Sequence, residues 1–99
     1  MTLAEYIIED TAKAFGEEPS KIYSEDRTRD VSEARDASIW LIKERLGLSN
    51  WEIGNILGSR LPSTVSHSLK RTRERLKMDS RDSEQFRCRL SAAKKLCKK

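Results

Sequence analysis

Two helical patterns meet at a short glycine-containing turn in the second half of the chain, and they limit the fold more than any other feature. Ser49 and Glu52 are spaced as a capping box, in which each side chain satisfies a backbone N–H group at the start of a helix. Gly58 closes the apolar stripe that follows, and Pro62 suits the first position of the next helix. We therefore predict a helix-turn-helix over residues 49–78.

The first third of the chain also shows helical spacing. Thr2 and Glu5 repeat the capping-box pattern, and the apolar stripe behind them stops at Gly16. Pro19 opens a short turn of helix. The next residues, 27–30, are predicted to form a polar connector.

A long helix is expected from about residue 30 to residue 46, with Gly47 placed to end it. A final helix begins at about residue 83, after a polar break. Nothing in the sequence alternates as a half-buried β-strand would. The chain is therefore predicted to be one all-α domain over residues 1–99, frayed at its basic end, residues 97–99.

Length and charge narrow the class of protein. Ninety-nine residues suit one domain with a single core. The net charge of +4 hides a division: residues 1–59 hold seven Lys or Arg against twelve Asp or Glu, a net of −5. Residues 60–99 hold thirteen against four, a net of +9. A basic surface on an acidic scaffold favours binding to nucleic acid, and a solvated helical tail is the alternative.

The residue types argue against several classes of function. One histidine and two cysteines do not make a ligand set for a metal ion. No nucleophile–base–acid set and no pair of carboxylates indicates catalysis. No Gly-x-x-x-x-Gly-Lys-Ser/Thr loop is present to hold the phosphates of a nucleotide. We therefore expect no enzyme, and no cofactor, metal or nucleotide site.

Two features indicate the compartment. The N-terminus lacks the basic and apolar regions of a signal peptide, and no stretch approaches the roughly 18 apolar residues that span a bilayer. Cys88 and Cys97 are nine residues apart on one predicted helix, too far for a disulfide bond. Unpaired thiols fit a reducing cytoplasm, where the protein would associate with the nucleoid.

The second helix of the predicted helix-turn-helix has two unlike sides. At helical spacing, the side expected in the core carries Val65, Leu69, Thr72 and Leu76. The other sides carry Arg60, Ser63, Ser66, His67, Lys70, Arg71, Arg73 and Arg75. In a DNA-binding unit of this shape, the N-terminal turn of the second helix enters the major groove and flanking cations neutralise phosphates.

At these residues the chain resembles the C-terminal DNA-binding domain of the bacterial chromosomal replication initiator DnaA. That family shows a Leu-Ser-x-x-Glu-Ile-Gly run, a Gly-x-Arg turn and a Ser/Thr-Thr-Val-x-His helix start. The matching segments here are residues 48–54, 58–60 and 63–67. Upstream matches at the family spacing are Arg27, Arg29, Val31, Arg35, Lys43 and Glu44. The resemblance runs without gaps from about residue 11 to residue 90.

The resemblance implies a six-helix (TrpR-like) domain whose recognition helix reads the major groove of a nine-base-pair box. The implied DNA-binding residues are Arg27, Arg29, Arg35, Lys43, Arg60, Pro62, Ser63, Thr64, Ser66, His67, Lys70 and Arg71. Among them, Arg27 would reach the minor groove from the connector. Major-groove or phosphate contacts are implied for Arg35, Lys43 and Arg60. Ser63 and Thr64 would face bases or backbone, and His67 and Lys70 would lie beside phosphates.

Two departures from the family pattern alter these expectations. Where the family carries an Asp-His pair that contacts bases, this chain has Leu61 and Pro62, which lack those hydrogen-bonding groups. A good base contact contributes about 1–3 kcal/mol of discrimination, so recognition of the family's box would be weakened. Glu33 and Asp36 replace basic or neutral residues around Arg35, and acidic groups near a phosphate track would repel it.

The sequence thus predicts a helix-turn-helix protein that binds double-stranded DNA and regulates replication or transcription, with altered or reduced base specificity. The alternative is an adapter, a repurposed domain that binds a replication-regulatory protein without specific DNA binding. The replacement of the Asp-His pair by Leu61 and Pro62 favours the adapter, as do the acidic residues Glu33 and Asp36. Trp51, which is expected to be partly exposed at the start of a short helix, favours it too.

Overall fold

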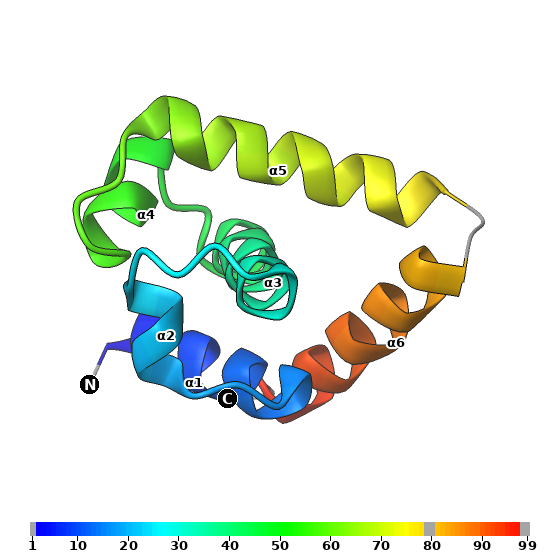
Figure 1. Cartoon of the computed structure of the whole chain (residues 1–99). Coiled ribbons are helices and arrows are strands. Elements are labelled where there is room, and N and C mark those ends of the chain that lie inside the picture. Colours follow the sequence, from blue (N-terminus) through cyan, green and yellow to red (C-terminus); the bar gives the residue numbers. More distant parts are fainter. Residues whose placement is uncertain (1, 79–80, 98–99) are drawn as a thin grey trace.

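The structure is a computed structural model that describes residues 2–78 and 81–97. Over these residues it contains six α-helices and no β-strand, which confirms the predicted all-α fold (Figure 1). The helices are α1 (Leu3–Phe15), α2 (Pro19–Tyr23), α3 (Arg29–Leu46), α4 (Asn50–Ile56), α5 (Pro62–Lys77) and α6 (Arg81–Leu96). Of residues 97–99, which we predicted to be frayed, Lys98 and Lys99 lie outside the described residues, whereas Cys97 is buried and its carbonyl accepts a hydrogen bond from Arg45.

Local sequence signals explain where the helices start and stop. Both predicted capping boxes form: Thr2 and Glu5 exchange side chain–backbone hydrogen bonds at the start of α1, and Ser49 and Glu52 do so at α4. Glycines in the left-handed conformation end α1 and α3, as the sequence predicted. These boundaries therefore depend on neighbouring residues and not on the tertiary fold.

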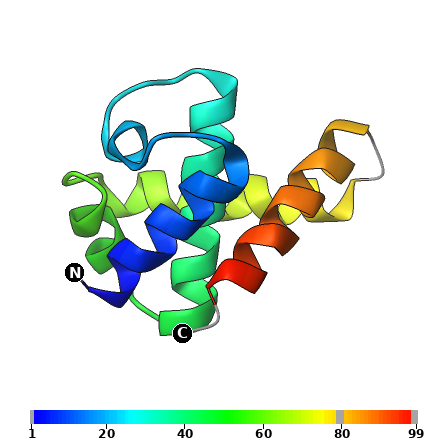
Figure 2. The ribbon, with the colours of Figure 1, turned by 90° about the horizontal axis from the view of Figure 1, so that it is seen from below.

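α3 is the central element of the molecule (Figure 1). It packs against α1 on one side and α5 on the other, and α6 packs mainly against α1. Figure 2 shows α1 crossing α3, with α6 beside them. Ten of the eighteen residues of α3 are buried, because other helices cover most of its circumference.

The core gathers apolar side chains from every helix. Phe15 of α1 and Phe86 of α6 meet edge to face, with their ring centroids 5.8 Å apart. Of the α5 stripe predicted for the core, Val65 and Thr72 are fully buried. The other two stripe positions, both leucines, are partly buried against the core. The largest fully buried aliphatic side chains are Ile8, Ile22, Val31, Ile39, Leu41, Ile42, Ile53, Leu57 and Val65.

The turn between α4 and α5 is folded tightly. Gly58 and Ser59 both adopt positive φ angles, 85° and 60°. The backbone N–H of Arg60 then donates to the carbonyl of Gly54 at 2.8 Å, which returns the chain across the middle of α4. A Cβ atom at position 54 would clash with the carbonyl oxygen of Arg60. Only glycine at position 54 allows this approach, and the approach sets where α5 begins.

Candidate nucleic-acid interface

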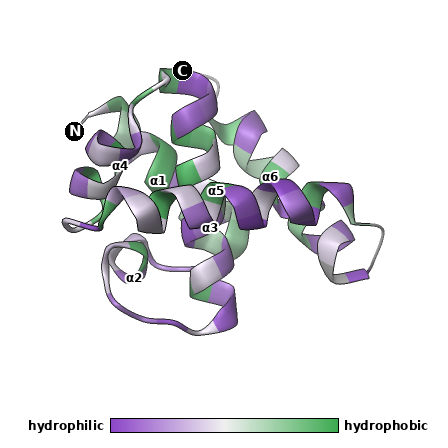
Figure 3. Ribbon diagram, turned by 90° about the horizontal axis from the view of Figure 1, so that it is seen from above, coloured by the Kyte–Doolittle hydropathy of each residue, from purple (hydrophilic) through white to green (hydrophobic). Residues whose placement is uncertain are grey.

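α5 presents an exposed polar surface along its N-terminal half. Ser63, Ser66, His67 and Lys70 are exposed and recur at three- and four-residue spacings, so they share one side of the helix. Together with the exposed Pro62 at its start, they form what we call the outer face of α5. Figure 3 shows that hydrophilic residues are frequent along α5 toward its C-terminal end.

A polar cleft of about 440 Å³ lies between α5, α3 and the connector that follows α2. Its lining includes five of the predicted site residues, Arg27, Arg35, Arg60, Thr64 and Arg71. We call it the arginine cleft. The fold thus brings together side chains that are widely separated along the chain, and it places them beside the outer face of α5.

Arg35 is built into the wall of this cleft and is only 8% exposed. Its guanidinium donates to the backbone carbonyls of Lys21, Ile22 and Ser24, at 3.1, 2.9 and 2.8 Å. Burial, and then the neighbouring charge of Arg60, lowers the pKa of Arg35. These three hydrogen bonds fasten the end of α2, and the connector after it, to α3.

Arg60 holds the same connector from the helix-turn-helix side. Its guanidinium donates to the carbonyl of Ser24, and its Nε is buried with no hydrogen-bond partner among the described residues. Within the connector, the Asp26 carboxylate accepts from the N–H of Thr28 at 2.8 Å, and this bond lowers the pKa of Asp26. The connector is therefore held in one shape, from which the exposed side chain of Arg27 projects.

Asp36 is buried in the wall of the arginine cleft and paired with cations, so it does not present the free carboxylate that we expected to repel phosphates. It is 1% exposed and accepts hydrogen bonds from the Ser68 hydroxyl at 2.6 Å and from Arg71 and Arg75 at 3.0 and 2.9 Å. These bonds raise the pKa of Arg71. We call this group the Asp36 anchor. It neutralises the carboxylate internally and joins α3 to α5.

The remaining predicted site residues lie outside the arginine cleft. Arg29 is exposed at the start of α3, with its Nε 3.7 Å from the carboxylate of Glu33, which is itself buried. Lys43 is half-buried near the end of α3, where its Nζ donates to the Leu48 carbonyl at 2.9 Å and the Asn50 side chain at 3.3 Å. Lys43 thus fastens the loop that leads into α4.

Sequence reasoning missed the partners within the Asp36 anchor. The sequence pattern singled out no role for Ser68, and it placed Arg75 on the basic side of the helix, near phosphate or in solvent. Arg75 instead spans from Asp36 to the ring of Phe86, with its guanidinium carbon 5.2 Å from the ring centroid. The one available signal was the position of Ser68 within the buried stripe of α5, where a polar side chain requires a partner.

The leading end of α5 is apolar. Leu61 is the N-cap residue, it makes no side-chain hydrogen bond to the helix, and its side chain is 68% exposed. Leucine ranks among the least favourable N-cap residues, because it offers no acceptor to the free N–H groups of the first turn. Pro62 follows at the first helical position, where its missing N–H costs nothing.

Leu61→Ser should raise the free energy of unfolding by about 0.5–2 kcal/mol, because the serine hydroxyl accepts a hydrogen bond from an N–H of the first turn. Urea unfolding followed by circular dichroism measures the change. Leu3→Ser is the matched control, since Leu3 is another exposed leucine but lies inside α1, next to an N-cap that is already satisfied. A loss of stability from Leu61→Ser would contradict the conclusion that the first turn of α5 has free N–H groups for a capping side chain.

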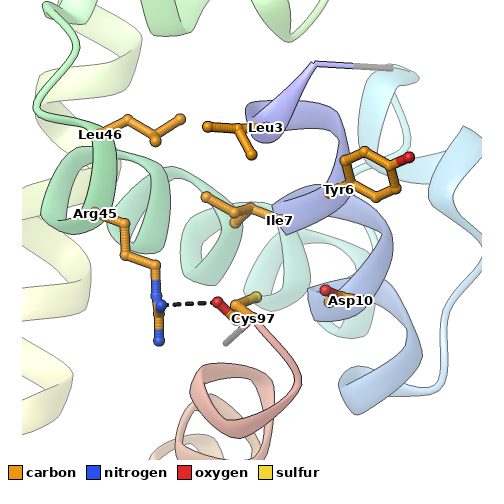
Figure 4. A pocket seen from close by; sticks show the side chains of 7 residues that line it. All are labelled: Leu3, Tyr6, Ile7, Asp10, Arg45, Leu46 and Cys97. Carbon is orange, nitrogen blue, oxygen red and sulfur yellow. Dashed lines mark hydrogen bonds between the residues drawn. The ribbon is translucent and has the colours of Figure 1, made fainter. Parts of the chain in front are cut away.

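A second hollow, of about 560 Å³, lies where α1 meets the ends of α3 and α6. Its lining is Leu3, Tyr6, Ile7, Asp10, Arg45, Leu46 and Cys97 (Figure 4). Arg45 donates to the backbone carbonyls of Cys97 and Lys94, at 2.8 and 2.9 Å, and so caps the end of α6. Burial raises the pKa of the Cys97 thiol. With its arginine engaged in this way, the hollow is not part of the candidate interface.

Among residues 2–78 and 81–97, His, Cys, Asp and Glu side chains form no group of three or more that is placed to hold a metal ion. None of the helices described there combines the length and apolar character needed to cross a membrane.

The fold and the site define a class of protein. A short helix, a tight turn and a longer helix with an exposed polar N-terminal half make a helix-turn-helix. Arginines line the cleft beside that half, and DNA-binding units of this kind use arginine and lysine near phosphates. This is the arrangement of a helix-turn-helix DNA-binding domain.

The chain belongs to the family described as the bacterial DnaA protein helix-turn-helix, whose model matches residues 4–72. The resemblance predicted from the sequence is therefore confirmed. The matched residues run from α1 into α5, and they include the outer face of α5 and the arginine cleft.

Curated relatives are chromosomal replication initiator proteins DnaA. The protein from Lachnoclostridium phytofermentans is 33% identical over 73 residues, which cover 74% of this chain and 16% of the relative. The protein from Nautilia profundicola is 36% identical over 90 residues, covering 91% of this chain and 20% of the relative. The protein from Chloroflexus aurantiacus is 31% identical over 78 residues, with coverages of 79% and 16%. The chain thus spans a fifth or less of the length of these relatives.

Proposed function

We propose that this chain binds double-stranded DNA with the outer face of α5 in the major groove and Arg27 in the adjacent minor groove. The observation that carries the proposal is the position of the arginine cleft, which lies between the side of α5 that bears Thr64 and Arg71 and the connector that bears Arg27. The major groove is about 12 Å wide and admits an α-helix. The sugar-phosphate backbone that separates the two grooves would then run along the cleft.

The charges of the interface suit this position. Residues 60–99 carry a net charge of +9, and Lys70 lies on the outer face of α5. Each phosphate that a cation neutralises releases counterions, so the affinity depends steeply on salt. We propose direct DNA contacts for Arg27, Arg29, Arg60, Pro62, Ser63, Thr64, Ser66, His67 and Lys70. We propose supporting roles, through the elements that they hold, for Arg35, Lys43 and Arg71.

The biological role proposed for the chain is regulatory and not catalytic. The relatives are named as replication initiators, and the part that matches this chain is their helix-turn-helix. We infer that the chain acts on replication or transcription in the cytoplasm by occupying DNA at the nucleoid. Its base preference would differ from that of the relatives, because Leu61 and Pro62 form the leading turn of α5.

Lys70→Ala should weaken binding to all duplexes about equally and should reduce the slope of log affinity against log salt by about one, because one phosphate contact is lost. Fluorescence anisotropy with labelled random-sequence duplexes, across a salt series, measures both. Lys13→Ala is the control, since Lys13 is an exposed lysine on α1. If the unmodified protein binds no duplex at low salt, the proposed function is wrong.

The adapter remains a second candidate because of one observation. Trp51, in the first turn of α4, is 64% exposed, and exposed tryptophan is enriched where proteins meet. Asp36 gives the adapter no support, because it is buried in the anchor. A pull-down from bacterial lysate treated with nuclease distinguishes the two functions. Partners that survive removal of DNA and depend on Trp51 would favour the adapter.

A further inference from the structure

Leu61 places an apolar tip at the end of α5 that would lead into the groove. At 68% exposed, it is the most exposed large apolar side chain among the described residues. Along the chain, Arg60 of the arginine cleft precedes it, and Pro62, Ser63 and Thr64 follow it in the exposed first turn. Apart from Pro62 these residues are polar, so Leu61 is an exposed apolar tip within a polar segment.

The backbone around this tip also departs from what helix stability favours. α1 and α4 begin with capping boxes, and α2, α3 and α5 begin without a side-chain cap; at α5 the N-cap residue is a leucine, which has no acceptor to offer. Positions where a local rule is broken without a packing gain are expected to be functional. Pro62 then fixes the backbone φ angle and removes one N–H donor, so the tip is stiff and has no hydrogen bond to offer.

Only one group on the base edges of the major groove suits contact with an apolar side chain. The N-terminal residues of the second helix in a helix-turn-helix contact base edges. Every base presents polar groups there, and thymine alone adds an apolar one, its C5-methyl group. Leucine can pack on that methyl. Against cytosine or guanine it would cover an amino or carbonyl group without replacing the hydrogen bond to water.

We propose that Leu61 is a specificity-determining residue that recognises the C5-methyl group of a thymine in the major groove. This inference rests on the proposed function, since it requires α5 to enter that groove. It adds a base preference that the polar residues of the outer face do not supply. It also gives the leading turn a mode of recognition based on apolar contact and on the exclusion of polar base edges.

The test begins with selection of bound sequences from a random duplex pool by the unmodified protein. In the selected duplex, each thymine is then replaced in turn by deoxyuridine, which removes only the methyl group. We expect one position where this replacement weakens binding about fourfold, the value for one buried methyl-sized group. Leu61→Ala should bind the thymine and deoxyuridine duplexes equally at that position. Leu3→Ala, a matched truncation of an exposed leucine on α1, should keep the difference.

The outcomes separate this inference from the function on which it rests. Equal binding of the unmodified protein to every thymine and deoxyuridine pair would overturn the role of Leu61 but leave DNA binding intact. Retention of the fourfold loss in Leu61→Ala would also overturn it. So would a selection that enriches no sequence. Failure to bind any duplex at low salt would overturn the proposed function, and the inference with it.

Discussion

Asp36→Ala should lower the free energy of unfolding by about 3–5 kcal/mol, because it removes the carboxylate from a buried ion pair and leaves its partners in place. The Ser68 hydroxyl loses its acceptor, and the half-buried guanidinium of Arg75 loses the carboxylate with which it pairs. A domain of this size has a total stability of about 5–15 kcal/mol, so this one change removes a large fraction.

Glu44→Ala is the control, because it removes a carboxylate from an exposed ion pair and not from a buried one. Glu44 pairs with Lys94 at 3.6 Å, but both side chains are exposed, so the loss there should be about 0–1 kcal/mol. Urea unfolding of both variants, followed by circular dichroism, measures the difference. Similar small losses in the two variants would show that Asp36 does not anchor α5 to α3.

Gly54→Ala should lower the free energy of unfolding by about 1–3 kcal/mol, through overpacking of backbone against a new methyl group. In an ordinary helix the same substitution stabilises by about 1 kcal/mol, so the sign of the effect is diagnostic. Here the added Cβ meets the carbonyl of Arg60, which is rigid backbone and must shift. That shift moves the start of α5 relative to α4.

Gly54→Ala should also weaken binding to duplex DNA by about tenfold, the equivalent of one lost contact of about 1.4 kcal/mol. Stability is measured by thermal and urea unfolding, and affinity by anisotropy at a temperature where the variant is folded. Asn55→Ala is the control, because Asn55 is exposed in the same helix and should change stability by less than about 0.5 kcal/mol. A stabilising effect of Gly54→Ala would show that α4 and its turn are not in close contact.

The helices were predictable because their signals are local. The Thr2–Glu5 and Ser49–Glu52 boxes form within four residues of chain, and the stripe over Val65 and Thr72 follows from helical spacing alone. The start of α6 was less well placed: it begins at Arg81, and we expected it near residue 83. A helix start without a capping signal in the sequence can be predicted only to within one or two residues.

The outward-facing part of the candidate site was predictable and its supporting part was not. Exposure of Ser63, His67 and Lys70 follows from their place opposite the core stripe. The burial of Asp36 does not, because its partners lie more than 30 positions away on another helix, and no local pattern tells which side chains of α3 and α5 meet. Arg35 is a similar case, since its acceptors are backbone carbonyls, which any sequence provides.

The hydrogen bonds that Arg35 and Arg60 donate to the connector after α2 bear on the speed and strength of association. A free segment that bears a groove-binding arginine loses conformational entropy when it orders on DNA, at about 1–2 kcal/mol per residue. In this protein that ordering is completed during folding. Arg27 would therefore enter the minor groove from a connector that is already ordered. The entropy cost of binding would be smaller, and association would not be slowed by ordering of the connector.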